Sequence, residues 1–349
     1  MKRGHVRSDR AGPGAAGASP LERALAGGIR ERGPISLAEF METALYHPEH
    51  GYYQAERQRI GLNASSDFFT AYAAGDVFAE LVTTAALRLL EEAPPELLEW
   101  VEIGAERGRS LWKTAPKPFR SLRSLALGDN LRIPPEAVVF SNELFDARPF
   151  HRVRFTHGGW KETGVGIEGS RFVETVLEEP TAAVEALRDR LPPAPPPNSV
   201  LDLPAGAVSL LERIVSQRWQ GLFVAFDYGK RWEELIHEHP HGTLRAYSRH
   251  RQNPDILARP GQQDITGHIC WDWMVDVLSA HGFHHINLDS QESFFVKYAA
   301  PAIERIIQRR PGLPDPARQR LQQLIHPANM GRKFQVLSAR RNSGGMALD

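Results

Sequence analysis

Two carboxylates and an amide follow a short apolar segment in the middle of the chain. Residues 142–146 have the sequence NELFD and come directly after residues 137–140, which have the composition of a buried strand. Burying an unpaired charge costs free energy, so carboxylates at such a place tend to serve a ligand or a partner. The alternative is that Glu143 or Asp146 caps the following helix. The pattern favours the functional interpretation.

A glycine turn follows an earlier strand candidate. Residues 97–103 lead into the sequence GAERG, which begins at Gly104 and ends at Gly108. Glycines in such a turn let backbone amides approach a ligand, and the N-terminus of a following helix would favour an anionic group. A tight strand-to-helix turn without any ligand explains the two glycines equally well.

Three further segments carry polar side chains that could contact a substrate. Asp227 begins the sequence DYG after the strand candidate 222–226, and there it could equally cap a turn. Residues 242–251 form a basic and aromatic run, and such charge runs are commonly solvated surfaces. Residues 263–268 are typical of a loop that enters a helix, with an aspartate or threonine as its cap.

The histidines and the cysteine count argue against a metal centre. His237, His239 and His241 alternate along the chain, but no neighbouring segment completes the ligand set of a zinc site. We therefore predict a histidine-bearing loop and no metal. The only cysteine is Cys270, which excludes an intrachain disulfide and a cysteine zinc cluster.

The elements that must position these polar side chains are short apolar strands. Residues 97–103, 137–140 and 222–226 lack the alternation of a half-exposed strand, which favours a parallel sheet buried on both faces. Because ligands bind at the carboxyl ends of such strands, the polar residues after all three should share one crevice. Residues 285–288 and 334–338 are predicted to close the sheet.

The remaining elements are predicted from periodicity and from turn residues. Helices are expected over 36–46, capped by Ser36 with Glu39 as its capping-box partner, and over 75–92 and 181–190. A strand is expected over 124–127, and a β-rich insertion over 151–179. The fold class that follows is α/β.

Composition limits the classes of function. The chain has 349 residues, and its 42 lysines and arginines balance 42 aspartates and glutamates, which argues against a dedicated nucleic-acid binder. No apolar run is long enough for a membrane span, so neither nucleic acid nor a membrane is expected as a partner. Residues 1–20 lack an apolar signal segment and are predicted to be a disordered tail. The expected location is the cytoplasm.

Seven segments, in the same order, resemble the MidA family of class I S-adenosylmethionine-dependent methyltransferases. They are ISLAEFM (35–41) with YHPEHGYY (46–53), SDFFT (66–70), NELFDARP (142–149), DYG (227–229), GTLRAYSRH (242–250), QDITGH (263–268) and MGRKF (330–334). The resemblance implies a Rossmann-like sheet that binds S-adenosylmethionine. It also implies a helical N-terminal cap over 21–95 and a core over 96–349, with insertions at 151–200 and 230–270.

The resemblance implies roles for single residues as well. Glu143 and Asp146 would be the catalytic pair, which orients an acceptor such as a guanidinium and draws off its charge. The cofactor would contact Glu102, Gly104, Gly108, Asp129 at the ribose, and Asn142. The substrate, a protein with arginine as one option, would contact Asp227, Tyr228, Arg245, Tyr247, Asp264 and His268.

The chain departs from the family pattern in two places. Ala105 and Glu106 replace a proline and a glycine of the family's turn, and Glu106 would bring a negative charge towards the cofactor's carboxylate. Only 33 residues separate Gly108 from Asn142, about the length of a single βαβ unit. Three interpretations stay open: an active methyltransferase, a binding or assembly factor that has lost the chemistry, and, ranked last, a Rossmann-type dehydrogenase.

Overall fold

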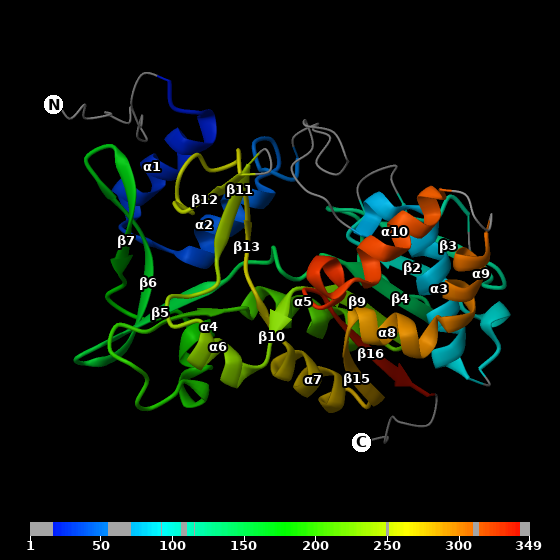
Figure 1. Cartoon of the computed structure of the whole chain (residues 1–349). Coiled ribbons are helices and arrows are strands. Elements are labelled where there is room, and N and C mark those ends of the chain that lie inside the picture. The colour runs from blue at the N-terminus through cyan, green and yellow to red at the C-terminus, as the bar shows by residue number, and fades with distance from the viewer. Residues whose placement is uncertain are drawn as a thin grey trace, which may run out of the picture. The chain divides into compact units, whose positions relative to one another are not determined.

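The computed structural model describes residues 17–54, 71–91, 93–105, 110–114, 116–248, 251–309 and 314–342. The chain divides into two units, and it enters the first of them in three separate stretches (Figure 1). The first unit comprises Met1–Glu56, Pro149–Leu203 and Pro240–Ile265. The second comprises Arg57–Arg148, Pro204–His239 and Thr266–Asp349.

The second unit is built around a six-stranded sheet with the order β15-β16-β9-β4-β2-β3. Strands β3, β2, β4 and β9 are parallel, whereas β16 runs antiparallel to both β9 and β15. The strands are β2 (Glu99–Ile103), β3 (Ser121–Leu125), β4 (Glu136–Asn142), β9 (Gln220–Asp227), β15 (His284–Ser290) and β16 (Gln335–Arg341). The parallel α/β sheet predicted from the apolar runs is confirmed.

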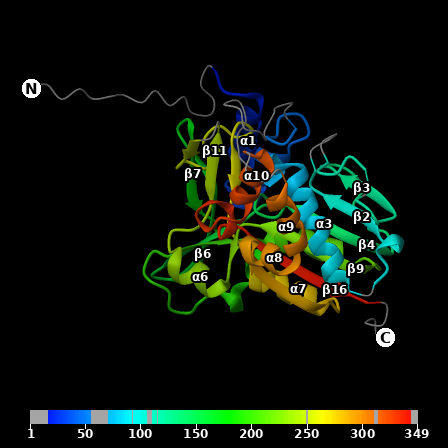
Figure 2. The same ribbon diagram turned by 45° about the vertical axis from the view of Figure 1, so that its right-hand side comes forward.

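Helices cover the sheet because its central strands are apolar on both faces. Phe140 and Phe226 face a cluster with α3 (Asp76–Leu90), α8 (Gln291–Tyr298), α9 (Ala300–Gln308) and α10 (Pro316–Ile325). Figure 2 shows α3, α8 and α9 beside strands β4, β9 and β16. Alternate residues such as Val139 and Phe223 are buried on the opposite face. The second unit also contains helices α5 (Ala205–Val215), α6 (Trp232–Glu238) and α7 (Trp271–Ala280). Two short strands, β10 (Gly229–Lys230) and β14 (Ile269–Cys270), pair in parallel.

The sheet is shortened at its β3 edge. Residues 126–135, all of them described, lead from β3 to β4 without a helix. Between β2 and β3, the described residues also contain no helix. The sequence interval of 33 residues correctly predicted that this side of the fold is reduced, but the helix expected directly after the glycine turn is absent from its described part.

The first unit contains the predicted β-rich insertion. Strands β5 (His151–Thr156), β6 (Gly159–Glu168) and β7 (Arg171–Val176) form an antiparallel meander, joined by β1 (Ile35–Ser36) and β8 (Val200–Leu203). A second sheet has the order β12-β11-β13, with β11 (Arg245–Ser248), β12 (Arg251–Asn253) and β13 (Asp264–Thr266). The helix expected over 181–190 is broken into α4 (Ala182–Glu185) and the 3-10 turn η3 (Arg188–Arg190).

The helices of the first unit begin at side-chain caps. Helix α1 (Pro20–Arg32) is capped by Ser19, so the expected tail 1–20 ends earlier than predicted, and residues 1–16 lie outside the described part. Helix α2 (Leu37–Tyr46) begins as predicted, with the Ser36 hydroxyl accepting a hydrogen bond from the Glu39 amide at 3.0 Å. The Glu39 carboxylate instead accepts from Arg32, at 3.0 Å.

The division into units differs from the expected domain boundaries. The segment 21–95, expected as one cap, contributes α1 and α2 to the first unit and α3 to the second. The reason is the apolar face of α3, whose Phe78 ring lies 5.3 Å from that of Phe226 in the sheet core. The first unit takes in the whole insertion expected at 151–200 and only residues 240–265 of the one expected at 230–270.

Candidate functional site

Gly104 begins the turn after β2. Its φ of +87° lies in the left-handed region, which favours glycine, and its amide donates to the Leu125 carbonyl at 2.9 Å. A Cβ at this position would lie 2.9 Å from Cδ1 of Leu144, in the turn after β4. The glycine therefore lets two strand ends approach closely. Glu106 and Gly108 lie outside the described residues.

Glu102 is a buried carboxylate that shapes the loop behind this turn. It has no solvent exposure and accepts hydrogen bonds from the Tyr72 and Ser110 hydroxyls and, at 3.1 Å, from the Leu111 amide. Burial raises the pKa of Glu102 above its ordinary value, and the three donors oppose that rise. The contacts attach residues 110–111 to the end of β2. Direct contact between Glu102 and a cofactor stays a prediction.

The stretch after the glycine turn is held by aromatic packing instead of by a helix. The Trp112 ring lies 4.5 Å from Trp100 of β2 and 5.1 Å from Phe140 of β4. The described part of this stretch therefore supplies no helix N-terminus for an anionic group, which corrects the prediction made from the glycines.

Asn142 ends β4 with an unsatisfied acceptor. The residue is 6% exposed, and its Oδ1 has no hydrogen-bond partner among the described residues, although its Nδ2 donates to Oε1 of Glu143 at 2.9 Å. A buried acceptor without a donor costs about 1–3 kcal/mol, so such groups need an explanation. A donor on a bound ligand would satisfy this oxygen. The geometry fits the cofactor-binding role predicted for Asn142.

Glu143 and Asp146, the predicted catalytic pair, lie in the turn that follows β4. Glu143 has a φ of +51°, and non-glycine residues in this region are concentrated at functional sites. Asp146 is only 5% exposed, and its carbonyl accepts a hydrogen bond from the Gly267 amide at 2.8 Å. The structure thus brings together the 142–146 turn and the end of the 263–268 segment.

The carboxylate of Asp227, at the end of β9, accepts hydrogen bonds from backbone amides. Its Oδ2 accepts from the Leu144 and Phe145 amides at 3.1 and 2.8 Å, and its Oδ1 accepts from the Tyr228 amide at 2.8 Å. The Asp146 amide is a further donor. The residue has no solvent exposure, and burial raises the pKa of Asp227 to about 7. The expected contact between Asp227 and a substrate does not fit this burial.

Replacing Asp227 with asparagine should change how stability depends on pH. Because the pKa of Asp227 rises from 3.8 to about 7 on folding, the folded protein binds the extra proton between these values. The stabilisation that comes from this extra proton is fully present below the unfolded pKa of 3.8. It is lost as the pH rises through the folded pKa of about 7. Relative to Asp227→Asn, the wild type should lose up to about 4 kcal/mol between about pH 4 and pH 8. Urea denaturation across this range measures the difference, and a constant difference would contradict the raised pKa.

Tyr228 and His268, both predicted to contact a substrate, also lie in the second unit. The Tyr228 ring packs at 4.0 Å against Phe334, in the closing MGRKF segment. The His268 ring lies 5.2 Å from His239 in an edge-to-face arrangement. The structure therefore explains the Tyr228 ring by packing, and substrate contact by either residue stays a prediction.

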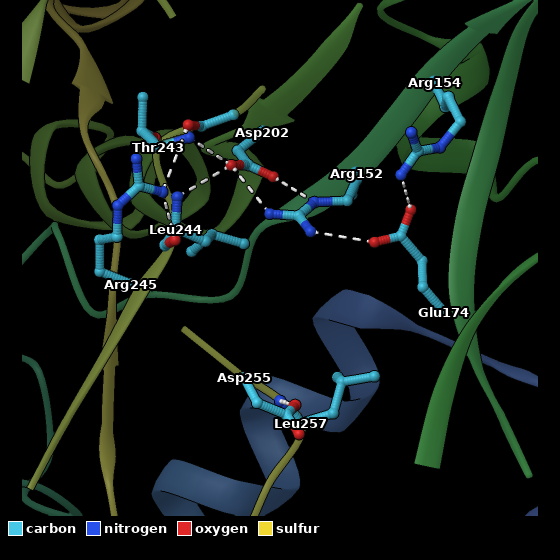
Figure 3. Close-up of polar contacts among 10 residues, drawn as sticks. Arg152, Arg154, Glu174, Asp202, Thr243, Leu244, Arg245, Asp255 and Leu257 are labelled. Atoms are coloured by element: carbon cyan, nitrogen blue, oxygen red, sulfur yellow. Dashed lines mark hydrogen bonds and ion pairs between the residues drawn. The ribbon is translucent and has the colours of Figure 1, made fainter. Parts of the chain in front are cut away.

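Arg245, Tyr247 and Asp264 lie in the other unit. Figure 3 shows Arg245 close to Thr243 and Leu244, and its Nη1 donates to the Leu244 carbonyl at 2.7 Å. Asp264 is 5% exposed and accepts a hydrogen bond from the Tyr53 hydroxyl at 3.0 Å. Tyr247 is partly buried in β11. Residues 249–250 of this run lie outside the described part.

Asp129, predicted to contact a ribose, closes the turn after β3. Its Oδ2 accepts from the Ala126 amide at 2.8 Å, and the Asp129 amide donates to the Ala126 carbonyl at 3.1 Å. The side chain is exposed beside the shortened edge of the sheet. This position explains the aspartate as a turn residue, and ribose contact stays a prediction.

Asp202 is a buried aspartate that the sequence analysis did not single out. Its Oδ2 accepts from the Thr243 and Leu244 amides at 2.6 and 2.9 Å, and Arg152 pairs with both of its oxygens (Figure 3). A Cβ on Gly242, whose φ is +75°, would lie 2.4 Å from the same Oδ2. Asp202 follows the apolar residues 200–201 inside a buried strand, so the rule that identified Asp227 could have found it.

The described residues contain neither a metal-binding cluster nor a membrane-spanning helix. No group of three or more histidine, cysteine, aspartate or glutamate side chains in the described ranges is placed to hold a metal ion. No described helix is long and apolar enough to cross a membrane.

The chain is similar to methyltransferases in sequence. Residues 119–288 match a family model whose description is "Putative S-adenosyl-L-methionine-dependent methyltransferase". The mitochondrial protein arginine methyltransferase NDUFAF7 homolog of Drosophila melanogaster is 24% identical and covers 92% of this chain and 85% of its own length. Mitochondrial protein arginine methyltransferase NDUFAF7 of Danio rerio is 23% identical and covers 90% of this chain and 85% of its own length.

The similarity extends to a solved structure. A Burkholderia thailandensis protein, crystallised with S-adenosyl-homocysteine bound, matches with a TM-score of 0.81 and 26% sequence identity. The match covers 92% of each chain. Both units of this chain therefore have counterparts in a protein that binds the demethylated form of a methyl donor.

Proposed function

Because this chain belongs to the MidA family of S-adenosylmethionine-dependent methyltransferases, we propose that it methylates an arginine side chain of a partner protein. The observation that carries the proposal is the end of β4. There a buried Asn142 oxygen, for which the described part of the chain supplies no donor, adjoins Glu143, a carboxylate on a left-handed backbone. The named arginine methyltransferases among the relatives support a guanidinium as the acceptor.

The residues at the strand ends fit the methionine part of the cofactor. Gly104 gives the turn after β2 its left-handed backbone beside Leu144, and Oδ1 of Asn142 can accept a hydrogen bond from an ammonium group. The shortened β3 edge offers less for the adenosine part, with Asp129 as the expected contact. We therefore expect binding to depend mainly on Gly104 and Asn142.

S-adenosylmethionine supplies a methyl group on a sulfonium when it is bound. The chain's own task is to hold the acceptor nitrogen in line with that methyl group. The amide of Asn142 fixes the Glu143 carboxylate through Oε1, and Asp146 lies three residues further along the same turn. Two carboxylates can orient a guanidinium by charge-assisted hydrogen bonds and accept the proton that the methylated nitrogen releases.

The shortened sheet edge favours a second candidate function. The described residues between β2 and β3 contain no helix. The chain could therefore keep the fold as a binding or assembly factor and lack the chemistry. Cofactor binding separates this alternative from the first. The dehydrogenase interpretation finds no support, because the relative and the solved structure that match 92% of this chain are described as methyltransferases.

Asp146→Asn should abolish methyl transfer and leave the protein folded. The variant keeps the size of the side chain but removes the negative charge that a guanidinium requires. Transfer from S-adenosylmethionine with a labelled methyl group to proteins of a cell extract, followed by amino-acid analysis for methylated arginine, measures the effect. We expect a loss of at least about 100-fold, since electrostatic groups of this kind commonly contribute that much.

The matched control is Asp189→Asn, at an exposed aspartate of η3. It should transfer label at the wild-type rate. Label on another residue type would overturn the arginine assignment, and activity retained by Asp146→Asn would show that Asp146 is not catalytic. If calorimetry with millimolar S-adenosylmethionine gives no heat of binding, the enzyme proposal fails and the binding-factor alternative replaces it.

The proposed activity implies a class of partner, whereas the location of the protein in the cell is a separate prediction. A partner protein is expected as the substrate, and neither nucleic acid nor a membrane is part of the proposal. A cytoplasmic location stays a prediction, and the two animal relatives described above are named as mitochondrial. Fractionation of the source cells tests it directly.

A further inference from the structure

The Asp227 carboxylate gathers backbone amides from two separate segments. Leu144 and Phe145 donate to Oδ2 at 3.1 and 2.8 Å, and Asp146 is a third donor from the same turn. Tyr228, next to the aspartate itself, donates to Oδ1 at 2.8 Å. Three consecutive amides that converge on one carboxylate define the backbone conformation of their turn.

These amides belong to the turn that carries the two proposed catalytic carboxylates. Its first residue, Glu143, has the left-handed φ of +51°, and its amide donates to the Phe226 carbonyl at 2.9 Å. The β4–β9 pairing therefore continues up to Glu143. From Leu144 onwards the amides of the turn donate to the Asp227 carboxylate instead. A left-handed backbone at a non-glycine residue costs of order 1–3 kcal/mol and persists only where surrounding contacts determine it.

Asp227 has no access to a substrate. The side chain is fully buried, and none of the described residues forms an ion pair with it. Asp202 of the first unit binds two consecutive amides with similar geometry, but there Arg152 balances its charge. At Asp227 the groups of the described residues that stabilise the carboxylate are backbone amides.

We propose that Asp227 is a positioning residue for methyl transfer, which holds the 143–146 turn so that Glu143 and Asp146 face the acceptor. This inference rests on the proposed function, because it assigns Asp227 an effect on the catalytic pair. It replaces the substrate contact that the sequence implied for Asp227. Removing the carboxylate should impair catalysis through the turn more than it impairs cofactor binding.

The test compares Asp227→Asn and Asp227→Ala with the wild type. Asparagine can offer its one oxygen to the Leu144 and Phe145 amides, whereas alanine offers none. We expect kcat to fall in the order wild type, asparagine, alanine, with the alanine variant at least about 100-fold slower, since small misplacements of reacting groups cost this much. The affinity for S-adenosyl-homocysteine should change less than about threefold.

A spectroscopic measurement separates positioning from general destabilisation. Protein labelled with ¹⁵N at leucine and phenylalanine should show the amide resonances of Leu144 and Phe145 shifted downfield in the wild type, because both donate to a carboxylate. Asp227→Ala should lose this shift, whereas Asp227→Asn, which keeps an acceptor oxygen without the charge, should keep part of it. The control, Asp202→Asn, removes the analogous carboxylate of the first unit and should leave these two resonances in place.

The outcomes separate this inference from the proposed function. If the wild type transfers no methyl group, the proposed function fails, and the resonances still report whether Asp227 holds the turn. If the wild type is active and Asp227→Ala, assayed well below its Tm, keeps wild-type kcat, Asp227 is not a positioning residue. Unshifted resonances in the wild type would overturn the hydrogen-bonding geometry itself.

Discussion

Gly104→Ala should lower the affinity for S-adenosylmethionine by at least about tenfold, which corresponds to about 1.4 kcal/mol. A φ of +87° disfavours any residue with a Cβ, at a cost of roughly 1–2 kcal/mol. The new Cβ would also lie 2.9 Å from Cδ1 of Leu144, a side chain only 4% exposed. Because Leu144 is buried, its side chain would have to shift within the packed turn after β4 to make room. Isothermal calorimetry with purified protein measures the affinity.

A second glycine provides the control for this prediction. Gly169 has a φ of +60° in the hairpin between β6 and β7, and a Cβ there would meet no atom within 4 Å. Gly169→Ala should therefore carry a similar backbone cost and lower the free energy of unfolding without changing the affinity for the cofactor. Wild-type affinity in Gly104→Ala would show that the turn after β2 takes no part in binding.

The strands of the second unit could be predicted because burial on both faces leaves a simple pattern. Residues 137–140 are apolar without alternation, and β4 extends this run by one residue on one side and two on the other. The same holds for 222–226 and β9. Polar residues that follow such strands must lie at one edge of a parallel sheet, so the proximity of Gly104 to the 142–146 turn also followed from the sequence.

The loop after Gly104 could not be predicted in the same way. Glycine spacing and a strand suggested a helix, whereas the described residues after the turn are held by Glu102 and by the Trp112 ring. One of the donors to Glu102 is Tyr72, which lies 30 positions earlier in the chain. A contact over such a distance leaves no local periodicity, so only the shortness of the segment indicated that something was missing.

The aspartates show where a residue pattern stops being informative. A carboxylate at the end of a buried strand was predicted to serve a ligand or to cap a turn, and the pattern could not decide between them. At Asp227 the decision comes from the amides of residues 144–146, which are about 80 positions away. Asp202 is held by the amides of Thr243 and Leu244 in the same manner. Tertiary contacts, and not residue type, determine which carboxylates face a substrate.

Arg341→Met should destabilise the protein by about 3–5 kcal/mol. Arg341 ends β16, is 7% exposed, and donates to the carbonyls of Val215, Gln217 and Trp219 at 2.6, 2.6 and 2.7 Å. Its guanidinium also lies over the rings of Trp219 and Phe283, 4.9 and 4.7 Å from their centres. Burial lowers the pKa of Arg341, yet the C-terminal end of α5 favours a cation. Methionine would fill the space but leave the Val215 and Trp219 carbonyls without the Arg341 donor, whereas the Gln217 carbonyl would still accept from the Trp219 amide at 3.1 Å.

Two further variants decide whether these hydrogen bonds cause the loss. Arg341→Lys keeps the charge without the planar fork, so it should recover only part of the stability in urea denaturation. Arg332→Met removes an arginine whose side chain is 74% exposed and lies 3.7 Å from Glu292, and it should cost less than about 0.5 kcal/mol. If Arg341→Met proved as stable as Arg332→Met, water would have to satisfy the Val215 and Trp219 carbonyls. The antiparallel pairing of β16 with β9 would then be sufficient to hold the last strand, and with it the sheet that positions Asp227.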